Sequence, residues 1–263
     1  MPRKTALITG ASSGIGRALA HQFALNGYNI VAVARTEEDL VTLTNELSVI
    51  EGTVAHWIAK DLAEDDAAQE IYDELLARSI LIDVLVNDAG IGQRELFHET
   101  DIEKDLIIIQ LNIVALTRMT KIFLRDMIIR NDGKILNVGS VASFQPGPLL
   151  AVYHASKAYV LSFSEAIAEE IKDSAVSITV LCPGATDTDF FRKADMQDTQ
   201  VYQHGQLMEP GEVAKVGYEA CMKGERVVIP GFTNKVMTFT RRLIPIGLQA
   251  KINKKFYEVS EES

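Results

Sequence analysis

Short runs of β-branched and aliphatic residues alternate with helix-length segments along most of the chain. The strand-like runs are apolar at consecutive positions, which is typical of strands that are covered on both faces. They lie at 5–9, 30–33, 54–58, 84–86, 135–138, 178–181 and 227–229. Helical stretches lie near 15–26, 37–49, 64–78, 102–130, 153–172 and 211–223. This α/β pattern predicts one doubly wound (Rossmann-type) domain, with a central parallel sheet of about seven strands and helices on both faces.

Residues 1–232 contain the whole alternating pattern, without a Pro/Gly-rich linker or an internal repeat. We expect them to form one domain, since α/β folds of this size are often single domains. Residues 233–263 extend beyond the last predicted strand. This C-terminal extension is expected to pack on the domain or on a partner subunit.

Residues 185–210 form a long, polar and turn-rich segment that follows a predicted strand. Apolar side chains occur within it: Phe190, Phe191, Met196, Tyr202 and Leu207. Segments in this place commonly cover ligands, and ligand cavities combine apolar surface with a few polar groups. One interpretation is a mobile lid over an apolar substrate. The other is an ordinary surface loop whose aromatic side chains face inward.

Charge is distributed unevenly. The net charge of −10 argues against a nucleic-acid partner, because phosphate binding needs a basic surface. Residues 233–256 nevertheless contain no acidic residue and several basic ones: Lys235, Arg241, Arg242, Lys251, Lys254 and Lys255. Apolar residues lie among them: Met237, Phe239, Leu243, Ile244, Ile246 and Leu248. Such a segment can lie on an anionic membrane surface, but packing on its own acidic domain or a second subunit is the favoured interpretation.

No segment approaches the roughly 18 consecutive apolar residues that span a bilayer. The apolar stretch Leu106–Leu116 is broken by Gln110 and Asn112, so a helix buried inside the protein is expected there. No targeting segment is visible, and Cys182 and Cys221 lack the spacing of metal ligands. We therefore expect a cytoplasmic protein with reduced, buried cysteines and no metal site.

The first predicted strand runs into Gly10-Ala-Ser-Ser-Gly14-Ile-Gly16, and a predicted helix follows at once. Glycines permit a sharp turn and let the backbone approach a pyrophosphate, which the free N–H groups and the positive end of the helix attract. A tight turn without a ligand would use the same residues. The position between the first strand and the first helix of an α/β pattern favours nucleotide binding.

Tyr153 and Lys157 lie four residues apart at the start of a predicted helix, which places phenol and ammonium on one face. A neighbouring ammonium is expected to lower the pKa of a tyrosine from about 10 and make it a usable general acid or base. Ser140 follows the predicted strand 134–138, at the edge where open parallel sheets form active sites. Its hydroxyl suits a developing charge on a substrate oxygen. The alternatives are an ordinary helix surface and an ordinary turn.

Several short motifs occur together: Thr9-Gly-Ala-Ser-Ser-Gly-Ile-Gly16, Asp61-Leu62, Asn87-Asp-Ala-Gly90, Asn112, Ser140, Tyr153-x-x-x-Lys157 and Pro183-Gly184. In order and in approximate spacing they resemble the short-chain dehydrogenase/reductase family, over residues 5 to about 230. The resemblance implies a nicotinamide cofactor and hydride transfer. One departure is Asp88, where the family usually has a second asparagine. An ionised carboxylate cannot donate hydrogen bonds as an amide does.

The resemblance also implies catalytic roles for four residues. Tyr153 gives a proton to the substrate oxygen, Ser140 orients that oxygen, and Lys157 binds the cofactor ribose and tunes Tyr153. Asn112 holds a water that passes protons to Lys157, although a helix-to-helix hydrogen bond would also explain a buried amide. His154 is expected to be structural. Besides Tyr153 and Lys157, the expected cofactor-binding residues are Gly10, Ser12, Ser13, Gly14, Ile15, Gly16, Arg35, Asp61, Leu62, Asn87, Ala89, Gly90, Pro183, Gly184 and Thr188.

The end of the second predicted strand bears on cofactor choice. Enzymes that use NAD commonly place an acidic residue there to bond the ribose hydroxyls. Here Ala34 occupies that position and Arg35 follows, and a guanidinium can make two charge-assisted bonds to a 2′-phosphate. We therefore expect NADP(H) rather than NAD(H). Against this, Glu37 and Glu38 are close in sequence, and Arg35 would also suit a solvent-exposed sheet edge.

Together these features predict an NADP(H)-dependent oxidoreductase that reduces a carbonyl, or oxidises the matching secondary alcohol, on a small apolar substrate. Two alternatives are a reductase of carrier-bound 3-oxoacyl chains and a non-catalytic protein that senses the cofactor. The complete set of Ser140, Tyr153 and Lys157 argues against the second alternative. We expect a homodimer or homotetramer.

Overall fold

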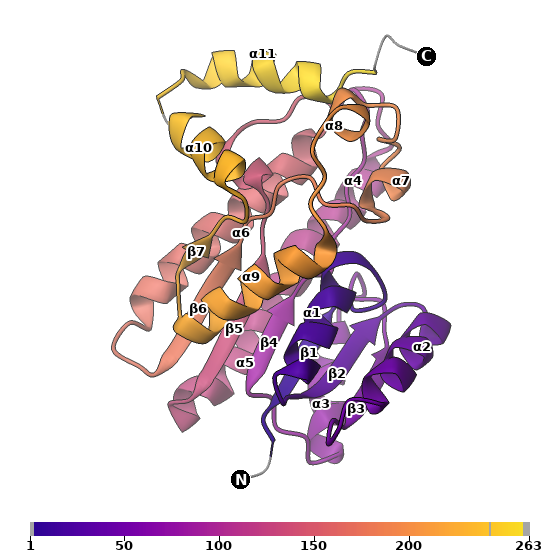
Figure 1. Ribbon diagram of the computed structural model, residues 1–263, viewed down its shortest axis with the longest axis vertical. Helices are drawn as coiled ribbons and strands as arrows, with labels where there is room; N and C mark the ends of the chain where they lie inside the picture. The colour runs from indigo at the N-terminus through magenta and orange to yellow at the C-terminus, as the bar shows by residue number, and fades with distance from the viewer. Residues whose placement is uncertain (1–2, 242, 260–263) are drawn as a thin grey trace.

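A seven-stranded parallel sheet forms the centre of the protein (Figure 1). The computed structural model describes residues 3–241 and 243–259, so Arg242 of the basic extension lies outside the described residues. The strand order is β3-β2-β1-β4-β5-β6-β7, which confirms the predicted doubly wound fold. The strands are β1 (Thr5–Thr9), β2 (Asn29–Ala34), β3 (Ala55–Ala59), β4 (Val84–Asn87), β5 (Gly133–Val138), β6 (Val176–Leu181) and β7 (Val227–Val228).

Helices cover both faces of the sheet, because successive side chains of each strand point to opposite faces. In β1, Ala6 and Ile8 belong to one apolar core and Leu7 belongs to the other. The first core is closed by α1 (Gly14–Leu25), α2 (Glu37–Ser48) and α9 (Pro210–Lys223). The second is closed by α3 (Ala67–Ala77), α5 (Leu116–Arg130) and α6 (Ala151–Glu170).

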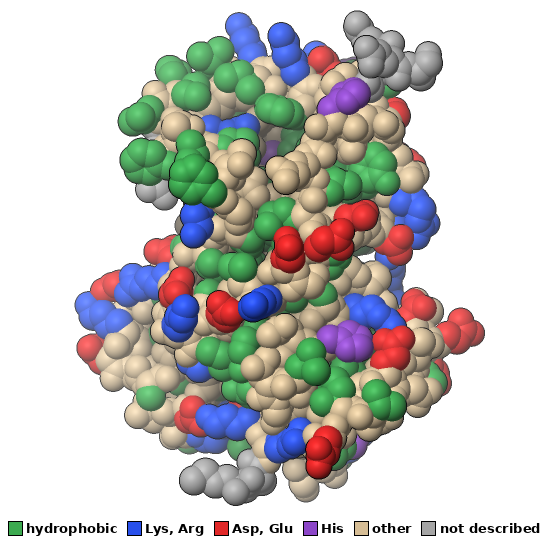
Figure 2. Space-filling view, viewed as in Figure 1, with side chains coloured by type: hydrophobic (Ala, Val, Ile, Leu, Met, Phe, Trp, Pro, Cys, Tyr) green, Lys and Arg blue, Asp and Glu red, His purple; other side chains and the backbone are tan. Residues whose placement is uncertain are grey.

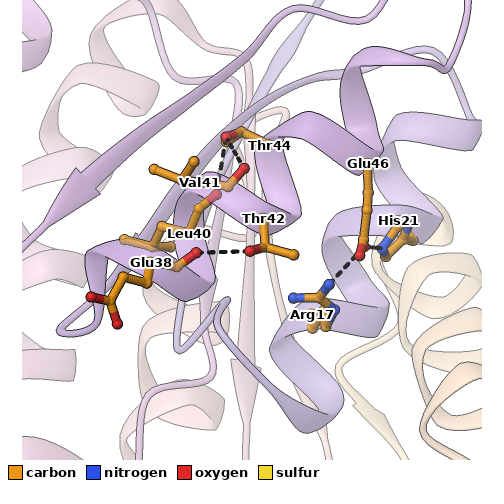
Figure 3. A network of polar contacts seen from close by, with 8 residues as sticks. All are labelled: Arg17, His21, Glu38, Leu40, Val41, Thr42, Thr44 and Glu46. Carbon is orange, nitrogen blue, oxygen red and sulfur yellow. Dashed lines mark hydrogen bonds and ion pairs between the residues drawn. The ribbon is translucent and has the colours of Figure 1, made fainter.

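Polar contacts tie α1 to α2 beside the sheet. Arg17 Nη2 and His21 Nε2 of α1 lie 2.7 Å and 3.2 Å from Glu46 Oε2 of α2 (Figure 3). The carboxylate of Glu38, in the first turn of α2, points away from this group in the same view. Arg17, which follows the glycine-rich turn, is therefore held by α2.

The apolar stretch 102–130 consists of α4 (Ile102–Ile109), a π-helical turn η1 (Gln110–Ala115) and α5. It is long and apolar enough to cross a membrane, a property that it shares with core helices of soluble proteins. α5 buries Met119, Phe123 and Met127 against the sheet. Leu106 and Ile107 of α4, however, are 47% and 45% exposed. The prediction of a buried helix is therefore wrong for α4, because only one of its faces packs on the domain.

Residues 185–210 and the chain after β7 lie together beyond one edge of the sheet (Figure 1). The first segment contains two short helices, α7 (Phe190–Lys193) and α8 (Gln200–Gln203), where a turn-rich loop was expected. The C-terminal extension forms α10 (Phe232–Arg241) and α11 (Ile246–Tyr257). α10 contacts the 3-10 helix η2 (Val141–Phe144), and α11 contacts α8.

The outer surface of α10 and α11 combines apolar and basic side chains, as Figure 2 shows at the upper end of the molecule. The exposed apolar residues of this surface are Phe232, Val236, Phe239, Leu243, Ile246, Leu248, Ile252 and Phe256. The exposed basic residues are Lys235, Lys251, Lys254 and Lys255. Arg241 instead points inward, where its Nη1 donates to Asn253 Oδ1 at 2.6 Å.

Candidate active site

A cavity of about 560 Å³ lies at the carboxyl edge of the sheet, beyond the ends of β1, β4, β5 and β6. Active sites of open parallel sheets form at this edge. The predicted site residues that line it are Gly10, Ser12, Ser13, Gly14, Ile15, Arg35, Asp61, Leu62, Ala89, Gly90, Ser140, Tyr153, Lys157, Pro183, Gly184 and Thr188. The fold thus gathers residues from separate strand ends around one cavity.

Asn87, Gly16 and Asn112 are predicted site residues that do not line this cavity. Asn87 is buried at the end of β4. Its Nδ2 donates to Thr120 Oγ1 of α5 at 3.1 Å and to Asn137 Oδ1 of β5 at 2.9 Å. Asn87 therefore joins three elements beneath the site, and no contact of its side chain reaches the cavity among the described residues.

Asn112 lies in the π-helical turn η1, an irregularity that is frequent at functional sites. Its Oδ1 accepts from the N–H of Ile91 at 3.0 Å, and its Nδ2 donates to the Ile91 carbonyl at 2.9 Å and to Ser156 Oγ at 3.0 Å. A Cβ on Gly90 would lie 3.2 Å from Asn112 Oδ1 and 3.4 Å from Lys157 Nζ. Asn112 therefore holds the loop after β4 against α6, and the helix-to-helix bond to Ser156 is present.

The glycine-rich turn and the loop after β4 touch directly. Thr9 Oγ1 accepts from the N–H groups of Asp88 and Ala89, at 3.1 Å and 3.2 Å. A Cβ on Gly10 would lie 2.9 Å from Ala89 N, and one on Gly16 would lie 2.4 Å from the Gly10 carbonyl oxygen. Gly10 also has a φ of 68°, which favours glycine. Glycine is therefore required at both positions to bring the two segments together.

Asp88, the departure from the family's asparagine, lies between these segments. Its Oδ2 would lie 2.5 Å from a Cβ on Gly16, and it receives a hydrogen bond from the Gly16 N–H. Burial raises the pKa of Asp88 from 3.8 to about 7, although the Lys157 ammonium and the Gly16 N–H oppose that increase. The carboxylate therefore makes the contact that an amide oxygen would make. Near neutral pH its protonated and ionised forms coexist.

Ser140 is positioned by the 3-10 helix that follows β5. It is the N-cap of η2, and its Oγ accepts from the N–H of Ala142 at 3.1 Å. A serine hydroxyl has one proton and two lone pairs, so the proton stays available while the oxygen caps the helix. Ser140 and Tyr153 are hydrogen-bonded to each other. The cap therefore aims the Ser140 hydroxyl at the phenol.

The protonation of Tyr153 is governed by burial. Burial raises its pKa to about 12, the hydrogen bond with Ser140 opposes that increase, and Asp88 adds to it. Lys157 Nζ lies 5.9 Å from the centroid of the phenol ring and donates to the Val138 carbonyl at 2.8 Å. Burial also lowers the pKa of Lys157. The prediction that Lys157 lowers the pKa of Tyr153 is therefore wrong for the protein alone, and Tyr153 is a protonated phenol at neutral pH.

The residues at the N-terminus of α1 fit a pyrophosphate. Ser13 is the N-cap but makes no side-chain capping hydrogen bond, so its hydroxyl does not occupy the first N–H groups of the helix, of which that of Gly16 donates to Asp88. Arg35 lines the cavity near this turn, with its side chain 64% exposed and its Nη1 4.0 Å from Asp61 Oδ2. The cavity therefore offers a dinucleotide an anion-binding site at the N-terminus of α1 and the Arg35 cation after the end of β2.

Apolar side chains form the remaining walls of the cavity. Phe190, Phe191 and Met196 of the segment 185–210 line it, and so does Ile107 of α4. The ring centroid of Phe190 lies 5.1 Å from that of Tyr153. The other predicted lid residues, Tyr202 and Leu207, pack behind these side chains. The segment thus covers the site as expected, and its mobility stays a prediction.

Two further residues shape this apolar end, and no motif in the sequence marks them. Tyr257, at the end of α11, lines the cavity. Arg94, in the loop after β4, donates from Nε to the Asp195 carbonyl at 2.9 Å and from Nη2 to both carboxylate oxygens of Asp198. These contacts join the loop after β4 to the segment 185–210, far apart in sequence, and α11 packs on the same segment at α8.

Comparison with known proteins agrees with this geometry. A family model described as short chain dehydrogenase matches residues 4–199. The 17-beta-hydroxysteroid dehydrogenase type 3 of Mus musculus is 32% identical over 219 residues, which cover 82% of this chain and 70% of that protein. The 3-oxoacyl-(acyl-carrier-protein) reductase of Escherichia coli is 30% identical over 72% of this chain and 76% of its own length. A short-chain dehydrogenase from Sphingobium yanoikuyae, solved in complex with NADPH, is 28% identical, with a TM-score of 0.81 over 99% of this chain and 100% of that one.

Replacement of Asp88 by asparagine should change how stability depends on pH. The pKa of Asp88 is raised on folding, so its contribution is fully present below pH 3.8 and is lost as the pH rises to about 7. Asp88→Asn cannot ionise. As the pH rises from 5 to 8, the free energy of unfolding of the unmodified protein should therefore fall relative to that of Asp88→Asn, by on the order of 2 kcal/mol.

Urea unfolding at both pH values measures this difference. Asp39→Asn, which alters an exposed carboxylate in the first turn of α2, is the control. Its free energy of unfolding should depend on pH as that of the unmodified protein does. Parallel pH profiles for Asp88→Asn and the unmodified protein would show that Asp88 ionises freely in the folded state.

Proposed function

Because the chain belongs to the short-chain dehydrogenase family, we propose that this oxidoreductase uses NADP(H) to interconvert a ketone and a secondary alcohol on a small, largely apolar molecule. The observation that carries this proposal is the hydrogen-bonded pair of Ser140 and Tyr153 on the wall of a cavity that also reaches the glycine-rich turn. A protein that only senses the cofactor has no need of a proton donor at this place.

When bound, the nicotinamide cofactor supplies or removes hydride at the substrate carbon. Tyr153 is a protonated phenol at neutral pH and can donate its proton to the substrate oxygen during reduction. The Ser140 hydroxyl orients that oxygen and stabilises charge that develops on it. Lys157 is fixed by the Val138 carbonyl and keeps donor capacity for a cofactor hydroxyl. Asn112 acts indirectly: its hydrogen bonds to Ile91 hold the loop after β4 in place beside Lys157.

The apolar end of the cavity supports an apolar substrate. Phe190, Phe191 and Met196 would contact a hydrocarbon body whose carbonyl lies at Tyr153. The mouse relative is by name a hydroxysteroid dehydrogenase, and a steroid is an apolar molecule of this kind. A carrier-bound 3-oxoacyl chain, the substrate in the name of the Escherichia coli relative, is the alternative. Its acidic carrier would favour a basic rim. Two lysines outside the cofactor end line the cavity: Lys193 lies 3.9 Å from Asp189, whereas Lys104 makes no ion pair within the described part of the chain.

Preference for NADP(H) is supported by the charges at the end of β2. Ala34 stands where an acidic side chain would repel a 2′-phosphate, and the Arg35 guanidinium lines the cavity beside it. Glu37 and Glu38 are exposed in the first turn of α2. The similar structure from Sphingobium yanoikuyae contains NADPH.

Two exposed apolar surfaces support self-association as a homodimer or homotetramer. One is the outer face of α4, with Ile102, Leu106 and Ile109, and the other is the outer surface of α10 and α11. Large apolar patches rimmed by polar residues commonly mark interaction sites. The lysines of α10 and α11 would also suit an anionic lipid surface, the other partner expected for this extension. A monomeric mass in sedimentation equilibrium would contradict self-association, and sedimentation with anionic vesicles would reveal lipid binding.

Tyr153→Phe should abolish most of the activity and leave cofactor binding intact, because it removes the proton donor and keeps the ring. A general acid contributes about 10²- to 10⁴-fold, so kcat for reduction of an accepted ketone should fall by that range. Tyr159→Phe is the control. It removes a phenol from the same helix, where that hydroxyl bonds Thr117 Oγ1 and does not line the cavity. An unchanged kcat in Tyr153→Phe would overturn the assignment.

Arg35→Ala should weaken NADPH binding far more than NADH binding. One charge-assisted contact to a phosphate contributes about 1.5–3 kcal/mol, so the ratio of the two dissociation constants should shift by roughly ten- to hundredfold. Fluorescence titration with each cofactor measures it. Arg17→Ala removes a guanidinium that is engaged with Glu46 and should leave the ratio unchanged. Equal losses for both cofactors in Arg35→Ala would show that Arg35 does not select the phosphate.

A further inference from the structure

We propose that Tyr257 forms a second polar subsite of the cavity, which accepts a hydrogen bond from a hydroxyl or N–H group that the substrate carries at a distance from its carbonyl. The inference rests on the proposed function, because it concerns the substrate of the same cavity. Tyr257 is the last residue of α11. It lines the cavity together with Leu150, Phe191 and Met196.

The hydrogen bonds of His154 determine which atoms donate. The Gln145 carbonyl oxygen can only accept, so His154 Nδ1, 2.8 Å away, donates to it. His154 is 2% exposed, and burial holds its pKa below the usual value, so the ring is neutral. Its Nε2 then carries a lone pair and no proton. The Tyr257 hydroxyl, 3.0 Å from Nε2, must therefore donate to it.

The proton of Tyr257 is thus committed, and its oxygen can only accept from a ligand. Burial raises the pKa of Tyr257, so the hydroxyl stays protonated at neutral pH. Leu150, Phe191 and Met196, which line the cavity with it, have no side-chain donor to occupy the lone pairs that the Tyr257 oxygen retains. A donor on the substrate would satisfy the Tyr257 oxygen, whereas an ether or a carbonyl would not.

The two phenols of the cavity consequently have opposite hydrogen-bonding roles toward a substrate. Tyr153 is suited to donate to a carbonyl, and Tyr257 to accept from a hydroxyl or N–H group. Both rings contact His154, whose ring centroid lies 6.0 Å from that of Tyr153 and 5.5 Å from that of Tyr257. A ketone that engages both therefore carries its donor at a different point from its carbonyl, on a body that the apolar wall can cover.

Tyr257 is held in place by the elements around it. Arg94 Nη1 donates to the Tyr257 carbonyl at 3.3 Å while its Nη2 is bonded to Asp198. One turn earlier on α11, Asn253 Nδ2 donates to the Pro146 carbonyl at 2.6 Å. A binding group discriminates between ligands only when its supports fix it in position. The contacts from the loop after β4 and from the loop after η2 give Tyr257 this support.

Three matched ketones test the subsite: 4-phenylcyclohexanone, its para-hydroxy derivative and its para-methoxy derivative. The dissociation constant of each is measured by calorimetry with protein loaded with NADP⁺, so the readout does not need turnover. The protein should bind the hydroxy derivative about two- to tenfold more tightly than the other two, the range of one neutral hydrogen bond. Tyr257→Phe should lose this preference.

Tyr202→Phe is the matched control, because it removes a lid phenol that packs on Phe191 and does not line the cavity. It should retain the preference. Equal affinity of the unmodified protein for the three ketones, or a preference that survives in Tyr257→Phe, would overturn the subsite. NADPH consumption is followed separately. Preference without consumption would support the subsite and contradict the proposed function, whereas consumption without preference would do the reverse.

Discussion

The contact between the glycine-rich turn and the loop after β4 fixes the distance between the anion site and the catalytic helix. Gly10 and Gly16 leave no room for a Cβ, so the N-terminus of α1 sits directly against Asp88 and Ala89. The same loop continues to Ile91, which is bonded by Asn112 and through it to α6. The helix that carries the phenol and the ammonium is therefore placed relative to the anion site by a continuous series of backbone and side-chain contacts.

Burial decides the charges inside this frame. The phenol of Tyr153 and the carboxyl of Asp88 both have raised pKa values because the cavity wall desolvates them, and the pKa of Lys157 is lowered for the same reason. Desolvation disfavours the charged form of every group, whichever sign it has. Neighbouring charges offset these pKa shifts only in part. The resting site is consequently less charged than its titratable residues suggest, and Tyr153 is held as a proton donor.

The sequence was sufficient to predict the sheet and most residues of the cavity, because apolar runs and the ends of parallel strands have a direct geometric meaning. The four-residue spacing of Tyr153 and Lys157 correctly placed both on the cavity wall, but spacing carries no information about desolvation, so the direction of the pKa change was wrong. Asn87 belongs to a matching motif yet bonds only within the sheet region and α5. Tyr257 could not be predicted, because its contact with His154 depends on how α11 packs, and no local pattern encodes that packing.

The position of α11 has a practical consequence for handling the protein. β1 begins at the edge of the sheet opposite the cavity, whereas α11 lies at the cavity end of the molecule (Figure 1). α11 ends at Tyr257, and Glu258 and Val259 then bond to Gln200 and Thr199 of the lid segment. A fluorescent fusion joined directly after Val259 would start beside these bonds and strain the segment 185–210. The same fusion joined before β1 would start at the far end of the sheet, where immobilisation on a surface would also leave the cavity accessible.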